Sequence, residues 1–269
     1  MASCSRYLAS SATRRSFYVG DPYQQIYEWR GAVNAMAQID APKCALTESF
    51  RFGPTFAALA SRILSLLGER TPIRGQDGIG SIMVEDPSVS PPVDAILCRK
   101  NVTAIWQLAA GIEAGHKPAI RTSPTEIVAF ADGADQLLAG KRAFRPAAFS
   151  LFETWKDAQS FAQSAVGRDI LPIVRIVDVC GTDYLRVLAR QVTPEADADY
   201  VISTVHRAKG LQWKRVKVAN DFRFKTVDGR LTLDEDEMRL LYVAVTRAQH
   251  VLDISELREE LLRLFNSRR

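Results

Sequence analysis

Short apolar runs rich in valine and isoleucine recur along the chain and alternate with longer segments of helical periodicity. The runs lie at residues 18–20, 94–98, 200–204, 215–220 and 250–255. Strands that alternate with helices favour a parallel sheet, because each helix carries the chain back to the edge where the next strand begins. The pattern therefore predicts an α/β fold with a parallel sheet.

Three segments carry the start and stop signals of helices. Gly53 and Pro54 precede an apolar stripe that ends at Gly68, so proline opens the helix and glycine ends it. We expect Asn101 to cap a second helix. Asp234 is expected to cap a third helix, whose acidic first turn suits the positive end of the helix dipole.

Residues 121–199 differ from the rest of the chain. Helical patterns occupy 125–138 and 150–165, and a stretch containing Pro194 and two aspartates leads out of the segment. From these helical patterns we expect a small, mostly helical insertion in the α/β domain.

Composition excludes several classes of protein. The 269 residues are 47% hydrophobic and 25% charged, which excludes a collagen-like, a disordered or a small disulfide-rich chain. No stretch approaches about 18 unbroken apolar residues, so we expect a cytoplasmic protein that does not bind membranes. The four cysteines form no C-x-x-C pair, and we expect buried free thiols and no metal site. A net charge of +4 is compatible with a polyanionic partner without arguing for one.

Four short blocks combine glycine, aromatic and basic residues in arrangements that a packed core does not require. The first, VGDPYQQIYEWRGA at 19–32, contains Gln24, whose amide can orient a water molecule or contact a phosphate oxygen. Tyr27 and Trp29 offer flat faces beside the charge of Arg30, a combination that binds single-stranded nucleic acid. The alternative is that these aromatic side chains pack in the core.

The other three blocks are basic as well. In TESFRF at 47–52, Arg51 stands just before a helix, where its planar guanidinium can bind phosphate through two hydrogen bonds. ISTVHRAKGLQW at 202–213 follows a strand, and EMRLLYVAVTRA at 237–248 is an amphipathic helix with Arg247 near its end. A solvated Arg51 and a purely structural His206 are the alternatives.

In order and in detail, the four blocks resemble motifs III, IV, V and VI of the superfamily 1 DNA helicases of the UvrD/Rep/PcrA kind. The first block is most similar to the F-box DNA helicase branch. The resemblance implies a second RecA-like domain interrupted by a helical insertion similar to the 2B subdomain. It also implies three parts of the chain: a remnant of the first RecA-like domain at 1–38, the second RecA-like domain at 39–120 and 200–269, and the insertion at 121–199.

The resemblance also implies roles for individual side chains. The residues matched to γ-phosphate sensing and transition-state stabilisation are Gln24, Arg51 and Arg247. Those matched to nucleotide binding are Phe50, on the adenine base, and Gln212, where the family usually has glutamate. Those matched to single-stranded DNA are Tyr27, Trp29, Arg30, Thr204, His206 and Lys209. No residue is matched to a metal.

The sequence lacks the G-x-x-x-x-G-K-[ST] loop that binds ATP phosphates and the acidic pair that the family places before motif III. We therefore expect the C-terminal portion of an ATP-dependent 3′–5′ DNA helicase of replication, recombination or repair, inactive alone. ATP and Mg²⁺ would serve the complete enzyme without binding tightly to this chain. Single-stranded DNA and an N-terminal helicase portion, in cis or in trans, would be its partners, with a bacterial nucleoid as the expected location. The alternative is a non-enzymatic remnant that binds nucleic acid or protein.

Overall fold

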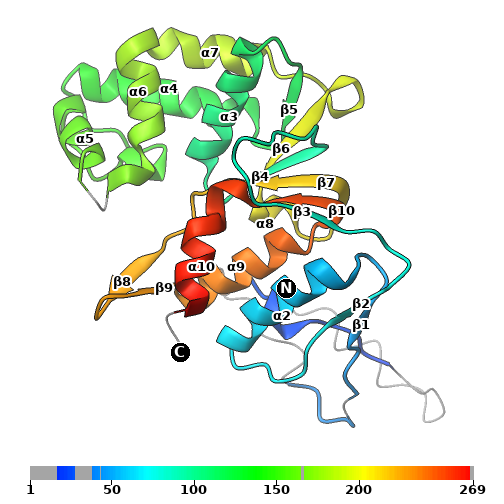
Figure 1. The fold of residues 1–269 in the computed structure, drawn as a ribbon. Coiled ribbons are helices and arrows are strands. Elements are labelled where there is room, and N and C mark those ends of the chain that lie inside the picture. Colours follow the sequence, from blue (N-terminus) through cyan, green and yellow to red (C-terminus); the bar gives the residue numbers. More distant parts are fainter. Residues whose placement is uncertain (1–16, 28–37, 43, 165–166, 267–269) are drawn as a thin grey trace, which may run out of the picture.

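The computed structural model describes residues 17–27, 38–42, 44–164 and 167–266 (Figure 1). Its centre is a six-stranded sheet in which every neighbouring pair is parallel, with the order β3-β10-β7-β4-β6-β5. The strands are β3 (Ile82–Val84), β4 (Ala95–Cys98), β5 (Pro118–Ile120), β6 (Tyr200–Thr204), β7 (Trp213–Val218) and β10 (Ala248–Asp253). The parallel α/β fold is thus confirmed, and it agrees with the second RecA-like domain that the resemblance implies.

Helices cover both faces of the sheet, because successive residues of a strand point to opposite sides. In β4, Ile96 and Cys98 enter one core cluster and Leu97 enters the other. On the Leu97 face lie α2 (Pro54–Leu66), α8 (Val205–Ala208), α9 (Glu235–Val245) and α10 (Arg258–Asn266). The other face carries α3 (Asn101–Glu113), and beyond it are stacked α4 (Pro124–Leu138), α5 (Trp155–Ala162), α6 (Leu171–Cys180) and α7 (Thr182–Arg190) (Figure 1).

Residues 121–199 are largely helical in the part that the structure describes, as expected. Their core is continuous with that of the sheet, since Leu108 of α3, Ile127 of α4 and Ile173 of α6 are all fully buried in one cluster. The Tyr184 hydroxyl of α7 also donates to Glu113 of α3 over 2.8 Å. The helical segment therefore packs as one body with the sheet, and its division from the sheet as a separate insertion stays a prediction.

One strand prediction was wrong, and two strands of the main sheet were missed. Residues 17–20 form no strand, and Val19 is 81% exposed, because no neighbouring strand pairs with this segment in the described structure. The short edge strands β3 and β5 were not predicted, since three residues carry too little periodicity. Of the three cysteines that the structure describes, Cys98 is buried as predicted, whereas Cys44 and Cys180 are exposed; Cys4 lies outside the described residues.

Several helix starts also differ from expectation. The second helix has Lys100, not Asn101, at its N-cap, and the carboxylate of Asp221 accepts from the backbone N–H groups of residues 99 and 100. Asp234 does occupy the N-cap of α9, but its side chain binds Lys225 and caps nothing. Helix α5 is shorter than residues 150–165, because a capping box between Thr154 and Asp157 starts it at Trp155.

Two small sheets flank the main one. The parallel pair β1 (Glu48–Ser49) and β2 (Arg74–Gly75) lies beside the start of α2, and β8 (Lys225–Val227) with β9 (Arg230–Thr232) forms an antiparallel hairpin. At the first pair, a Cβ atom on Gly75 would lie 2.1 Å from the carbonyl carbon of Gly53. This close backbone approach fixes the β1–α2 connection, which carries Arg51. None of the described helices is long and apolar enough to cross a membrane.

Candidate functional site

Six polar side chains from distant parts of the sequence meet beside the amino ends of β7 and β10. We call them the arginine cluster: Asp21, Gln24, Arg51, Gln212, Tyr242 and Arg247. The fold explains the meeting, because Gln212 directly precedes β7, Arg247 directly precedes the adjacent strand β10, and the Trp213 N–H donates to the Arg247 carbonyl over 3.0 Å. Notably, the cluster lies at the amino ends of these strands, whereas open α/β folds commonly bind ligands at carboxyl ends.

Arg247 is the most deeply buried member, with 1% of the residue exposed. Its Nε donates to the Val243 carbonyl over 2.9 Å, and Nη1 donates to the Leu211 carbonyl over 3.1 Å. Nη2 donates to Thr246 Oγ1 over 3.2 Å and to Gln24 Oε1 over 3.4 Å. Burial, followed by repulsion from Arg51, lowers the pKa of Arg247 to about 10. The side chain is therefore a rigidly held cation at neutral pH.

Arg51 is only partly buried and approaches the same place from the β1–α2 connection. Its Nε donates to Gln212 Oε1 and its Nη1 to the Thr246 carbonyl, both over 2.8 Å. Burial lowers the pKa of Arg51. Among the residues that the structure describes, none accepts a hydrogen bond from its Nη2, and neither Arg51 nor Arg247 forms an ion pair. The cluster thus holds two positive charges against the single negative charge of Asp21, and one open donor, which together suit an anion.

Asp21 and Tyr242 orient Gln24 within the cluster. The Asp21 carboxylate accepts from the Tyr242 hydroxyl and from Gln24 Nε2, each over 2.9 Å. With its nitrogen held by Asp21, the Gln24 amide turns its oxygen toward Arg247. Ile26, which is 6% exposed, anchors this segment in the core. Burial, together with the charge and hydrogen bond of Asp21, raises the pKa of Tyr242.

A second group of predicted residues gathers around Tyr27. The Tyr27 hydroxyl donates to the His206 carbonyl over 2.6 Å, the two rings lie 5.7 Å apart, and Lys209 Nζ lies 5.6 Å from the centre of the Tyr27 ring. Thr204, by contrast, is buried at the end of β6, and Phe50 is 73% exposed beside Arg51. The predictions for residues 29 and 30 lie outside the described residues.

Sequence reasoning missed several polar contacts in the domain, two of whose residues belong to the arginine cluster. Asp21 lies in the first of the four sequence blocks and Tyr242 in the fourth. No local sequence pattern indicates that these two side chains meet across 221 positions. Glu237 was expected only to complement the helix dipole. It is instead 4% exposed and forms an ion pair with Arg99 over 2.8 Å. The one available signal was an acidic residue on the otherwise apolar face of α9.

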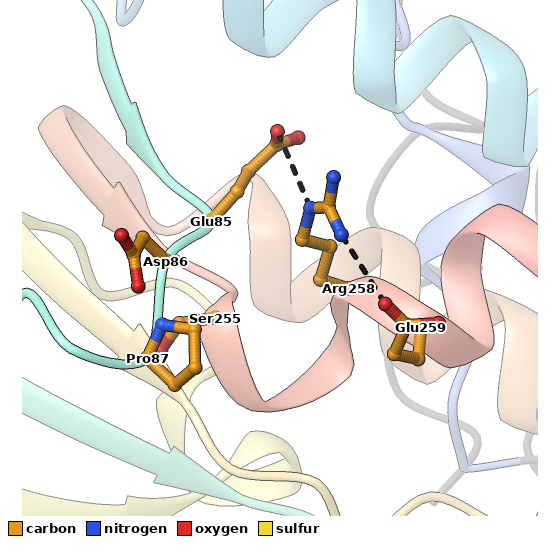
Figure 2. A pocket seen from close by; sticks show the side chains of 6 residues that line it. All are labelled: Glu85, Asp86, Pro87, Ser255, Arg258 and Glu259. Atoms are coloured by element: carbon orange, nitrogen blue, oxygen red, sulfur yellow. Dashed lines mark hydrogen bonds and ion pairs between the residues drawn. The ribbon is translucent and has the colours of Figure 1, made fainter.

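A separate hollow of about 490 Å³ lies at the other edge of the sheet, where β3 and β10 end (Figure 2). Arg258 stands between Glu85 and Glu259, with its Nε 4.0 Å and its Nη1 3.2 Å from the respective carboxylates. Asp86 adds a further negative charge to the lining. The hollow is therefore acidic on balance and does not suit the anion that the arginine cluster favours.

Comparison with known proteins identifies the domain. Residues 186–259, which contain motif V, Gln212 and Arg247, match the UvrD-like helicase C-terminal domain family. Over these residues the chain is similar to the UvrD-like helicase C-terminal domain. This finding agrees with the parallel sheet described above and confirms the resemblance on which the site residues were chosen.

Two relatives extend the similarity of this helicase domain over most of the chain. F-box DNA helicase 1 of Gallus gallus is 30% identical over 283 aligned positions, which cover 91% of this chain and 27% of that protein. F-box DNA helicase protein 1 of Schizosaccharomyces pombe (strain 972 / ATCC 24843) is 26% identical over 279 positions, 90% of this chain and 31% of that protein. The chain thus spans less than a third of either relative. Because both relatives are eukaryotic, they give no support to the expected bacterial nucleoid location.

Proposed function

We propose that this chain supplies the arginine-bearing side of the nucleotide site in a superfamily 1 DNA helicase that moves 3′ to 5′ on single-stranded DNA in replication, recombination or repair. The observation that carries the proposal is the meeting of two guanidinium groups, Arg51 and Arg247, whose charges outweigh the one carboxylate of the cluster, that of Asp21. Two fixed cations with one open donor stabilise the negative charge that develops on a phosphoryl group during its transfer. The 3′ to 5′ direction rests on the family resemblance alone.

Each member of the cluster has a distinct role in this proposal. The open Nη2 of Arg51 binds the transferring phosphoryl group, and Arg247 contributes its charge from a fixed position. Gln24 orients the attacking water through the amide that Asp21 holds. Phe50, exposed next to Arg51, stacks on the adenine base, while Gln212 keeps the Arg51 guanidinium in place.

ATP with Mg²⁺ fits this arrangement only in part. ATP supplies the phosphoryl group for transfer, and the two arginines suit its phosphates. Within the described ranges, however, no group of three histidine, cysteine, aspartate or glutamate residues could hold a metal ion. The phosphate-binding loop and the metal carboxylates would therefore come from an N-terminal helicase portion, in cis or in trans.

The group around Tyr27 provides the DNA side of the proposal. An aromatic ring, a histidine and a lysine offer stacking and phosphate contacts to a single strand, and we assign Trp29, Arg30 and Thr204 to the same role on the strength of their motif positions. The Tyr27 hydroxyl binds the main chain of His206. Movement of the segment that carries Gln24 would therefore be transmitted to the DNA-binding turn.

The test is ATP hydrolysis after complementation. The 269-residue chain is mixed with a separately produced N-terminal helicase portion that carries a phosphate-binding loop, with and without oligothymidylate. We expect hydrolysis stimulated by single-stranded DNA in the mixture and none from either part alone. DNA-stimulated hydrolysis by this chain alone would contradict the proposed division of the site.

A non-enzymatic role in binding nucleic acid or protein is the second candidate, favoured by the absence of G-x-x-x-x-G-K-[ST] from these 269 residues. Binding alone does not require two arginines that point at one anion. The same mixture distinguishes the two functions, because a binding module would retain oligothymidylate without any hydrolysis.

A further inference from the structure

The connection between α4 and the 3-10 helix η3 (Ala147–Phe149) carries an unusual concentration of positive charge. We call residues 141–145, with the sequence Lys-Arg-Ala-Phe-Arg, the basic loop. It contains three cations and one aromatic ring, and no aspartate or glutamate occurs between Gln136 and Phe152. The loop therefore presents charge of a single sign.

The backbone of the basic loop is held firmly against α4. At its start, the Lys141 N–H donates to the Gln136 carbonyl over 2.7 Å, and Ala143 in its middle is fully buried. At its end, a Cβ atom on Gly133 of α4 would lie only 2.5 Å from the Arg145 carbonyl oxygen. Phe149 follows, fully buried. Few conformations remain for the loop to lose when it binds a ligand.

The side chains of the basic loop point away from this anchored backbone. Phe144 is 79% exposed, and Lys141, Arg142 and Arg145 are exposed as well. Within the part of the chain that the structure describes, these three cations form no ion pair or side-chain hydrogen bond. The carboxylates of Asp132 and Asp135 on α4 instead form ion pairs with Arg186, each over 2.6 Å.

We propose that the basic loop binds single-stranded nucleic acid, with Phe144 stacked on a base and the flanking cations on phosphates. A flat ring exposed between cations matches the alternation of bases and phosphates along a strand. A duplex is the poorer ligand, since its bases are stacked inside and cannot reach the ring. The loop contains no residue of the arginine cluster or of the Tyr27 group, so it would be an additional contact for the strand beyond the proposed nucleotide and DNA sites.

Fluorescence anisotropy of a labelled oligothymidylate with the whole 269-residue chain tests the stacking. Phe144→Ala should weaken binding roughly 5- to 150-fold, because each stacked base contributes about 1–3 kcal/mol. Phe144→Leu, which keeps an apolar side chain but loses the ring, should weaken it as well. Val179→Ala is the matched control, since Val179 is 83% exposed on α6, and it should leave affinity and thermal midpoint unchanged.

The salt dependence tests the phosphate contacts separately. Replacing Arg142 and Arg145 together by glutamine should reduce the slope of log Kd against log salt by about 1.4. Each lost contact with a single-strand phosphate accounts for about 0.7 of this change. Arg175→Gln, an exposed position on α6, should leave the slope unchanged.

Three results would overturn the assignment. The first is unaltered affinity in all three loop variants, as expected if the loop serves an acidic protein surface. The second is equal affinity for a duplex of the same length with the same sensitivity to Phe144→Ala, and the third is no binding by the unmodified chain, which contains the whole loop. Because hydrolysis in the complemented mixture is measured independently, failure of the loop assignment leaves the proposed function standing.

Discussion

The arginine cluster and the basic loop use the same residue type in opposite ways. In the cluster, Arg247 is buried and donates to two backbone carbonyls, and Arg51 donates to a third. In the loop, Arg142 and Arg145 face solvent without a protein partner among the described residues. The backbone is fixed in both places, so the difference lies in the side chains.

This difference decides what each charge can do. A cation held by carbonyl groups in a water-poor place keeps its position and acts strongly on nearby charge. A cation in solvent is screened by salt and acts mainly through release of counterions from a polyanion. The cluster should therefore govern stability and rate, and the loop should govern salt-dependent affinity.

The largest expected effect on stability is at Arg247. Arg247→Ala should lower the free energy of unfolding by about 3 kcal/mol, because it leaves a cavity and removes a hydrogen-bond donor from each of two backbone carbonyls. Arg145→Ala in the basic loop should change it by no more than about 0.5 kcal/mol. Urea denaturation of the two variants checks this, and equal losses would remove the distinction between the regions.

A smaller effect is expected at Tyr242. Tyr242→Phe removes the hydroxyl that binds Asp21 and should cost about 1 kcal/mol. Tyr184→Phe is the matched control, because the Tyr184 hydroxyl also binds a carboxylate, but in an exposed position. Denaturation curves should rank Tyr242→Phe as the more costly change, and the reverse order would show that Asp21 is not held through this bond.

The smallest effect is a change of the Tyr242 contribution with pH. Because the pKa of Tyr242 is raised in the folded chain, its contribution is fully present below the ordinary tyrosine pKa of about 10 and is lost as pH rises toward the folded value. The difference in unfolding free energy between the unmodified chain and Tyr242→Phe should therefore shrink above pH 10. Denaturation at several pH values measures it, and a widening gap would contradict the raised pKa.

Local chemistry allowed much of the sheet and part of the site to be predicted. The strands β4, β6, β7 and β10 are apolar and bounded by turns, so local sequence patterns predict them. Arg51, Arg247 and Gln24 were selected because a packed core does not require charged or amide side chains at these positions. The structure brings all three together.

The remainder depends on distant contacts that no window of sequence contains. Asp21 and Tyr242 meet only because α9 packs against the segment of Gln24. Lys100 became an N-cap because Asp221, far along the chain, accepts from its N–H. The run at 18–20 resembles a strand in composition, but a strand needs a partner, and none pairs with it in the described structure.

The central claim is that Arg51 acts on the charge of the transferring phosphoryl group, and the kcat of ATP hydrolysis in the complemented mixture tests it most directly. Arg51→Ala should lower kcat by roughly 10³-fold or more while leaving the Kd for single-stranded DNA within about twofold of the unmodified value. Arg215→Ala, which breaks a surface ion pair with Asp94 on the same domain, should change neither quantity. An unchanged kcat, or equal losses in kcat and DNA affinity, would contradict the account.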